Sequence, residues 1–209
     1  MSFQDDKKYL EAMVALISDP KLRRACDGVL QDPRFLASPA AAKKHQAYEG
    51  GLVVHTAEVL RIALATAGSI KDLSSDVIIA GTLWHDYGKI WDYEEVNPVY
   101  DVDEDNPRYG YTRHRWTTRH LTRSYAEFVS AARQAIVDPD LVEEVGHCIL
   151  AHHGRQEWGS PVLPLTPEAF IVHMADTLSA RFTEKLHIFR VKRGKNGWKD
   201  DPTKRFQPS

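Results

Sequence analysis

The sequence has few cysteines, no long uncharged apolar run and few strand signals. Its 209 residues include only two cysteines, Cys26 and Cys148, which lie far apart. This pattern excludes a disulfide framework and a cysteine-rich zinc site, so a reducing compartment is expected. The opening residues MSFQDDKKYL lack the apolar core of a signal peptide. No later stretch approaches the roughly 18 apolar residues of a membrane span. We therefore expect a cytoplasmic protein with no membrane partner.

Charge of each sign is concentrated in separate segments, which the formal net charge of -2 conceals. Residues 91–105 contain seven acidic and no basic residues, whereas residues 106–126 contain five arginines and no acid. From Lys185 onward, eight lysines or arginines stand against two aspartates. Such runs usually form solvated loops and tails. The alternative is a basic rim that attracts phosphate, since aromatic residues are interleaved with the basic ones.

Most apolar residues recur at helical spacing, so the fold class is predicted to be all-α. The segment 76–84 is apolar nearly all round, which indicates a central, buried helix. Phe170, Met174, Leu178 and Phe182 form one apolar stripe on the last helix. The expected helices cover about 4–17, 21–30, 38–45, 52–67, 76–84, 117–132, a segment opened by Asp138-Pro139-Asp140, and 167–189.

Histidines and aspartates lie on the apolar faces or at the ends of several predicted helices. A single histidine on such a face is usually a hydrogen-bonded core residue. Burying many imidazoles and two carboxylates without compensation would be costly, and divalent cations supply that compensation. The candidate metal ligands are His55, His85, Asp86, His120, His152, His153 and Asp176. Imidazole and carboxylate without thiolate suit first-row divalent ions better than calcium.

These residues resemble the HD phosphohydrolases, whose defining order of His, His-Asp and Asp is matched by His55, His85-Asp86 and Asp176. Four longer segments look like the catalytic domain of the YhaM-type 3′-to-5′ exoribonucleases. They are SPAAAKKHQAYEGGLVVHT, LWHDYGKI, AHHGRQEWGSPVLPLTPEA and IVHMADTLSARF. The resemblance implies an HD-domain helical bundle over 38–189. An N-terminal helical extension over 1–37 and a basic, weakly ordered tail over 190–209 would flank it.

The resemblance also implies a ligand set for each of two divalent ions. One ion would bind His55, His85, Asp86 and Asp176. The second would share Asp86 and add His120, His152 and His153. His114 competes for the position of His120, which is preferred because it begins a predicted helix. Manganese is the first choice of metal, with iron, cobalt, nickel, zinc or magnesium as alternatives.

Further residues are candidates for contacting substrate. Lys89, in the HDxGK motif, would neutralise charge on the phosphoryl group in a two-metal hydrolysis. The alternative for Lys89 is a solvated lysine after a helix-ending glycine. Arg119, Arg155 and His45 would grip substrate phosphate, with exposed or structural roles as their alternatives.

The resemblance implies a 3′-to-5′ exonuclease-like phosphodiesterase acting on single-stranded nucleic acid. YhaM-type proteins carry an oligonucleotide-binding barrel before the HD domain, whereas residues 1–38 have helical periodicity here. Short single strands are therefore the expected substrates. The acidic segment 91–105 is unlike the family and is either a lid or a surface loop. One alternative function is a nucleotidase or (d)NTP phosphohydrolase on free nucleotides. Another is a non-catalytic nucleotide-binding regulatory module, although every expected ligand position is filled. The sequence indicates no oligomeric state.

Overall fold

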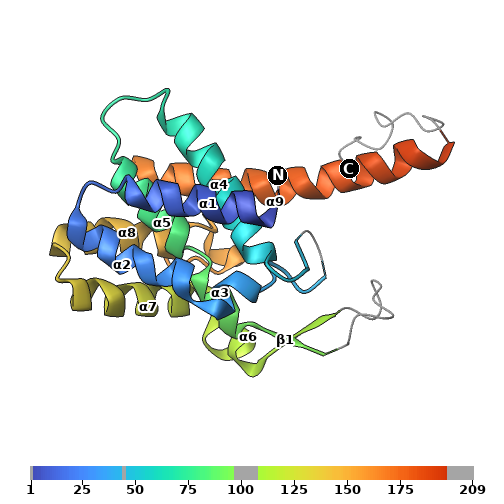
Figure 1. Cartoon of the computed structure of the whole chain (residues 1–209), viewed down its shortest axis with the longest axis horizontal. Helices are drawn as coiled ribbons and strands as arrows, with labels where there is room; N and C mark the ends of the chain where they lie inside the picture. Colours follow the sequence, from blue (N-terminus) through green and yellow to red (C-terminus); the bar gives the residue numbers. More distant parts are fainter. Residues whose placement is uncertain (1, 44–45, 97–107, 197–209) are drawn as a thin grey trace.

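A computed structural model describes residues 2–43, 46–96 and 108–196, with side chains described as far as residue 182. Within these residues helices predominate and the only sheet has two short strands, so the all-α prediction is confirmed (Figure 1). The helices are α1 (Phe3–Ala15), α2 (Pro20–Gln31), α3 (Pro33–Ala37), α4 (Gly51–Ala67), α5 (Ser75–Trp84), α6 (Arg113–Thr117), α7 (Arg119–Ala135), α8 (Pro139–Ala151) and α9 (Pro167–Asn196). Two 3₁₀ helices, η1 (Tyr87–Trp91) and η2 (Gln156–Trp158), and the strands β1 (Tyr93–Glu95) and β2 (Tyr109–Tyr111) complete the structure.

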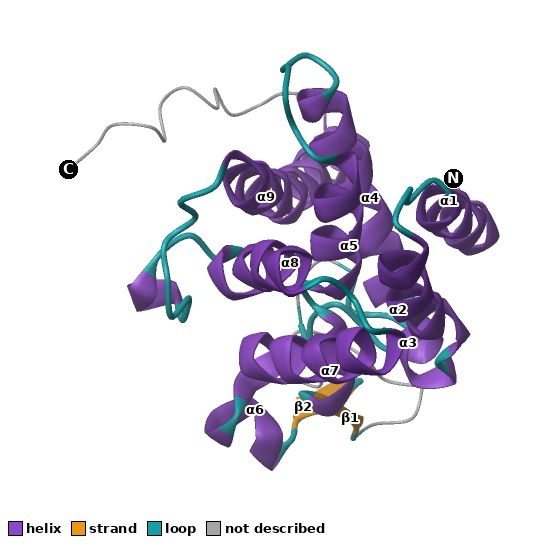
Figure 2. Cartoon of the chain, turned by 90° about the vertical axis from the view of Figure 1, so that its left-hand side faces the viewer, coloured by secondary structure: helices purple, strands orange, loops and turns teal. Residues whose placement is uncertain are grey.

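Helix α5 lies at the centre of the molecule, as its uniformly apolar sequence predicts. It packs against α2, α4, α8 and α9, which surround it in the view along the bundle (Figure 2). Every residue from Val77 to Trp84 is buried. The C-terminal end of α5 therefore delivers the next residues, His85 and Asp86, into the interior.

The N-terminal helices share the main core. Leu10 of α1 and Leu22 of α2 are fully buried and belong to the same apolar cluster as α4 and α5. Helix α3 begins where a helix end was expected, because Asp32 caps it and Pro33 occupies its first position. The predicted helix over 38–45 is wrong for its described part, since residues 38–43 are not helical. Ser38 precedes a proline and is extended, which is the conformation that proline favours before it.

The arginine-rich segment differs from its prediction in two ways. Strands β1 and β2 form an antiparallel hairpin in which Tyr93 pairs with Tyr111. The acidic segment therefore contains strand β1, and its part from residue 97 onward lies outside the described residues. The predicted helix over 117–132 corresponds to α7, which begins at Arg119, and the short helix α6 precedes it; Arg119, with a left-handed φ of 62°, lies where the two helices meet. His120 nevertheless lies in the first turn of α7, as expected.

Helix α9 presents two different faces. Its inner face buries Ala169, Val172 and Ala175 against the bundle. The predicted apolar stripe exists but faces solvent, with each member about half exposed; its residues are Phe170, Met174, Leu178 and Phe182. The helix continues to Asn196, beyond its predicted end, and projects past the other helices (Figure 1). Residues 197–209 of the predicted tail lie outside the described residues. Among the described helices, none combines the length and apolar character needed to cross a membrane.

Candidate metal centre

Five helices bring the seven predicted ligands to one place. His55 comes from the second turn of α4, and His85-Asp86 follow the end of α5. His120 begins α7, His152-His153 follow α8, and Asp176 lies in α9. They form two groups, each with ligand atoms within 4.8 Å of one another: His55, His85, Asp86 and Asp176, and His120, His152 and His153. The first group contains the four residues that the resemblance implied for one ion, and the second contains the three histidines implied for the other ion, without Asp86.

The carboxylate of Asp86 lies between the two groups. Its Oδ2 is 3.3 Å from Nε2 of His55 and 3.2 Å from Nε2 of His85. Its Oδ1 is 3.4 Å from Nε2 of His120 and 3.6 Å from Nε2 of His152. One oxygen therefore faces each group, which is the arrangement that a bridging carboxylate requires.

A close backbone approach holds the two groups together. A Cβ atom at Gly88 would lie 2.3 Å from the carbonyl oxygen of His120, so only glycine fits there. The Gly88 amide also donates to Oγ of Ser124 at 2.7 Å. These contacts hold η1 against the start of α7, and they keep Asp86 beside His120.

The histidines are oriented by their outer ring nitrogens. Nδ1 of His85 lies 2.6 Å from the carbonyl oxygen of Thr82, and Nδ1 of His152 lies 2.7 Å from that of Ile149. Nδ1 of His153 similarly lies 2.8 Å from the carbonyl oxygen of Trp158. A carbonyl can only accept, so each Nδ1 carries the hydrogen, and in the neutral ring Nε2 presents a lone pair to the cluster. Metal-binding histidines are commonly held in this way.

Protonation of His120 and His153 is suppressed. Burial lowers the pKa of His120 to about 4, despite its hydrogen bond to Asp92. Burial and the neighbouring imidazoles of His152 and His120 lower the pKa of His153 to about 3. Both rings are therefore neutral near pH 7, which is the state that ligates a metal.

In the other group, the charges of the carboxylates and of their neighbours determine the pKa values. Burial opposes protonation of His55, but Asp176 and Asp86 raise its pKa to about 9. Burial would raise the pKa of Asp86, yet Lys89 and His85 hold it well below its usual value. The pKa of Asp176 is also lowered, because hydrogen bonding to His55 and nearby imidazoles outweigh burial. Both carboxylates are thus ionised.

The donor atoms fit divalent cations. Nε2 of His85, Nε2 of His152 and Oδ1 of Asp86 are buried and make no hydrogen bond within the described part of the chain. Buried polar atoms without partners are costly and require an explanation. Lone pairs directed at a common centre are what a cation would satisfy, so the clusters could hold metal.

Lys89 lies beside the bridging carboxylate. Its Nζ is 2.6 Å from Oδ2 of Asp86, and its side chain is only 15% exposed. Burial would lower the pKa of Lys89, but Asp86 outweighs it and the pKa is raised. The ammonium group is therefore a fixed positive charge at the cluster, rather than the solvated lysine of the alternative interpretation.

Asp92 is a residue of this site that sequence reasoning missed. It is fully buried, and its Oδ2 lies 3.0 Å from Nδ1 of His120. His114 contacts the same carboxylate, with Nδ1 2.9 Å from Oδ1, and so lies behind the cluster rather than in it. Arg115 adds an ion pair at 3.2 Å. Asp92 belongs to an acidic segment, so its composition did not single it out, and its position three residues after the HDxGK segment was the only available signal.

Two of the three residues predicted to bind phosphate lie near the cluster, and the third is not described. Arg119 is exposed, and its Nη1 lies close to Gly159. A Cβ atom added to that glycine would lie 2.9 Å from this nitrogen. Arg155 lies over the ring of Trp158 at 4.8 Å. Both arginines therefore border the loop after α8, next to His153. His45 lies outside the described residues.

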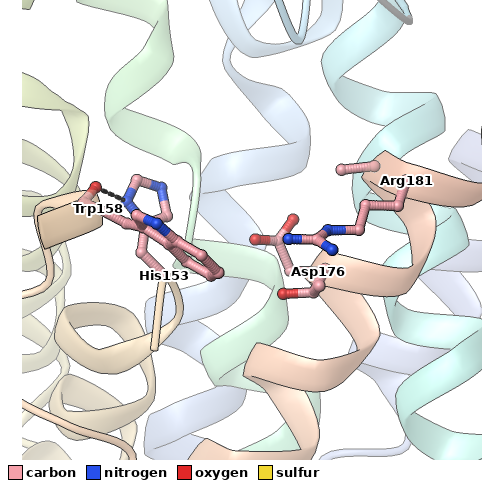
Figure 3. Close-up of a pocket in the computed structure, with 6 residues that line it drawn as sticks. His153, Trp158, Asp176 and Arg181 are labelled. Atoms are coloured by element: carbon pink, nitrogen blue, oxygen red, sulfur yellow. Dashed lines mark hydrogen bonds between the residues drawn. The ribbon is translucent and has the colours of Figure 1, made fainter. Parts of the chain in front are cut away.

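A pocket of about 280 Å³ opens beside the cluster, and its lining includes one ligand candidate from each group (Figure 3). It is lined by His153, Trp158, Asp176, Thr177, Ala180 and Arg181. Sequence reasoning missed Trp158 and Arg181 as site residues. Arg181 lies five positions after Asp176 on α9, so the i,i+3 and i,i+4 spacing of a helix gave no signal for it.

Comparison with known proteins supports the same assignment. The family model for the HD domain matches residues 52–181. The 3′-5′ exoribonuclease YhaM of Shouchella clausii is 32% identical over 167 residues, which are 79% of this chain and 49% of that protein. YhaM of Bacillus velezensis is 34% identical over 148 residues, covering 70% and 44%, and YhaM of Bacillus subtilis is 33% identical over 151 residues, covering 72% and 45%.

The chain spans about half the length of these curated relatives. No solved structure shows significant similarity to it. The HD match covers more than half of the chain and includes every residue that the two ligand groups contain. The chain therefore belongs to the HD domain family.

Proposed function

We propose that the chain is a metal-dependent phosphodiesterase that removes nucleotides from the 3′ end of short single strands. The observation that carries the proposal is the position of Asp86, with one oxygen facing each group of buried ligands. The similarity to proteins named 3′-5′ exoribonucleases supports the direction of cleavage and the substrate class. Because those proteins are about twice as long, the substrate preference needs its own test.

In this proposal the two groups hold two divalent ions, with manganese as the first choice and iron, cobalt, nickel, zinc or magnesium as alternatives. Mixed imidazole and carboxylate ligands support a first-row ion. When bound, such ions supply Lewis-acid stabilisation of phosphoryl oxygens and lower the pKa of water. Both cysteines are buried and free, which supports a reducing, cytoplasmic location.

The chain's own residues would complete the site. Asp86 fixes the spacing between the groups, and the Nδ1 contacts fix the ring orientations. The ammonium of Lys89, held at the cluster, offsets negative charge on a phosphoryl group. Arg119 and Arg155 border the loop after α8, and their guanidinium groups would suit phosphate oxygens.

The test is metal analysis followed by product analysis. Purified protein supplied with Mn²⁺ would be incubated with 5′-labelled single-stranded RNA, single-stranded DNA, nucleoside phosphates and cyclic dinucleotides. The proposal expects stepwise shortening of the strands from the 3′ end with release of nucleoside monophosphates. Orthophosphate or tripolyphosphate from free nucleotides would instead indicate the nucleotide hydrolase. Binding without turnover would indicate the regulatory module.

A variant links the activity to the cluster. Asp86→Ala should lower both metal content and turnover, by more than the about 10–100-fold that loss of an outer hydrogen-bond partner typically costs. Asp27→Ala is the matched control, because Asp27 is an exposed carboxylate on α2. An Asp86→Ala protein with full metal content and full turnover would refute the assignment.

A further inference from the structure

We infer that the pocket beside the cluster is the subsite for the terminal nucleoside of the substrate, with Trp158 stacking on the base and Arg181 pairing with phosphate. The inference rests on the proposed function and specifies how its substrate is held. The pocket lining contains His153 of one ligand group and Asp176 of the other. A group bound there would lie directly against both groups.

The size of the pocket suits a single nucleotide. Its volume of about 280 Å³ is close to the smallest volumes of small-molecule sites, which are about 300 Å³. One nucleoside with its phosphate is a ligand of this class, whereas several stacked nucleotides are not. The remainder of a strand would have to leave across the rim.

Trp158 is a stacking surface tied to a ligand candidate. Its side chain is 43% exposed, and its backbone carbonyl accepts from Nδ1 of His153 at 2.8 Å. Gly159, with a left-handed φ of 101°, ends the 3₁₀ turn that carries it. Figure 3 shows the indole and His153 on one side, facing Asp176 and Arg181 from α9. Every base has a π-face, so an exposed indole binds bases with little sequence preference.

Arg181 is a cation available for phosphate. Its guanidinium carbon lies 5.9 Å from the centre of the Trp158 ring, across the pocket. In the described part of the chain no carboxylate lies within ion-pair distance of it, whereas Arg108 and Arg115 pair with acids. An arginine fork matches the oxygens of a phosphate group. Base and phosphate recognition therefore meet within one pocket.

The test compares two probes that differ only in the base. Binding of adenosine 5′-monophosphate and ribose 5-phosphate to the Mn²⁺-loaded protein would be measured by calorimetry. The wild type should prefer the adenosine compound by about 10-fold, as stacking on an aromatic side chain typically provides. Trp158→Ala should remove this preference and keep the affinity for ribose 5-phosphate, while Trp158→Phe should retain most of it. Arg181→Gln should weaken both probes.

Trp116→Ala is the matched control, because Trp116 is a 69% exposed tryptophan that packs on Tyr111 of the hairpin, outside the pocket lining. It should leave both affinities unchanged. Equal binding of the two probes by the wild type, or an undiminished base preference in Trp158→Ala, would overturn the inference. Either result, in protein that still shortens labelled strands, leaves the proposed function standing. Failure of the wild type to bind metal or cleave any phosphate ester defeats the proposed function itself.

Discussion

Asp92 shows how a single buried carboxylate organises one half of the cluster. Burial would raise its pKa, but hydrogen bonding to His120 and His114 and the charge of Arg115 lower it, so it is ionised. An ionised acceptor behind Nδ1 of His120 fixes the ring and makes its Nε2 a better ligand. Asp92 therefore acts on the cluster through His120, without entering it.

Asp92→Asn should selectively weaken the three-histidine group. The amide is a poorer acceptor for His120 and offers no charge to Arg115, so affinity for the second ion should fall about 10–100-fold. Metal titration followed by mass spectrometry of the retained metal should show loss of one ion while the other remains. Glu94→Gln, a neighbouring exposed acid, is the control. Retention of two ions with unchanged affinity in Asp92→Asn would contradict this role.

The sequence predicts the candidate metal ligands better than the residues that hydrogen-bond to them. His55 and His152 could be found because helical spacing places them on apolar faces, and His85-Asp86 because a buried helix ends there. Asp92 and His120 are 28 positions apart, and their contact depends on how η1 packs against α7. No local pattern encodes that packing, so the same acid was assigned to a charged loop.

At the scale of elements, two glycines in helices give opposite predictions. A Cβ at Gly81 in α5 would lie 2.6 Å from Cβ of Cys148 in α8, so these helices pack closely there. A Cβ at Gly28 in α2 would meet no atom within 4 Å. Gly81→Ala should therefore lower the free energy of unfolding by about 1–3 kcal/mol through overpacking. Gly28→Ala should raise it by about 0.5–1 kcal/mol, because alanine favours the helix.

Denaturant unfolding of both glycine variants measures the two effects in the same assay. Each variant is the other's control, since both changes add one methyl group to a helix. An unchanged or increased stability in Gly81→Ala would show that α5 and α8 can separate without cost. A destabilised Gly28→Ala would show that α2 makes contacts at this position that the structure does not contain.

Asp76 joins the turn between α1 and α2 to the start of α5. Its carboxylate accepts from the backbone amides of Ser18 and Asp19 and from the Ser18 hydroxyl, all within 3.1 Å. Burial would raise its pKa, but these hydrogen bonds lower it. A depressed pKa means that the stabilisation is complete above the ordinary value of about 3.9 and is lost as pH falls through the lowered value.

Asp76→Asn should therefore destabilise the protein by about 1–3 kcal/mol at pH 7, where hydrogen bonds to a charged group are lost. The difference from the wild type should shrink below about pH 4, as the native carboxyl becomes protonated. Denaturant unfolding at pH 7 and at lower pH measures this, with Asp27→Asn as an exposed control. A stability difference that is constant with pH would show that the charge of Asp76 contributes nothing.

Helix boundaries were predictable where a cap residue and the proline after it allow only one interpretation. Pro167 with Thr166 before it marks the start of α9, and Pro139 with Asp138 marks that of α8. The pair Asp32-Pro33 ends one helix and begins another, so the same residues support two interpretations. The break at Arg119 has no proline or glycine to announce it. Its left-handed backbone reflects the tertiary path that places His120.

At the scale of the molecule, the cluster joins segments that are remote in sequence. His55 and Asp176 are more than a hundred positions apart, yet His55 Nε2 lies 3.1 Å from Oδ1 of Asp176. Because helices α4, α5, α7, α8 and α9 all contribute, an ion bound there would bind the native fold and not the unfolded chain. Binding of this kind stabilises the native state by mass action.

Chelation of metal should therefore lower the thermal unfolding midpoint of the wild type. An ion present at about 100 times its dissociation constant contributes about 2.7 kcal/mol, which corresponds to about 5–10 °C for a chain of this size. Scanning calorimetry with chelator and with increasing Mn²⁺ should show a midpoint that rises with metal concentration. Asp86→Asn should respond far less, because it lacks the charge that both groups share. A wild-type midpoint indifferent to chelator and to Mn²⁺ would mean that the buried imidazoles and carboxylates satisfy one another without any ion.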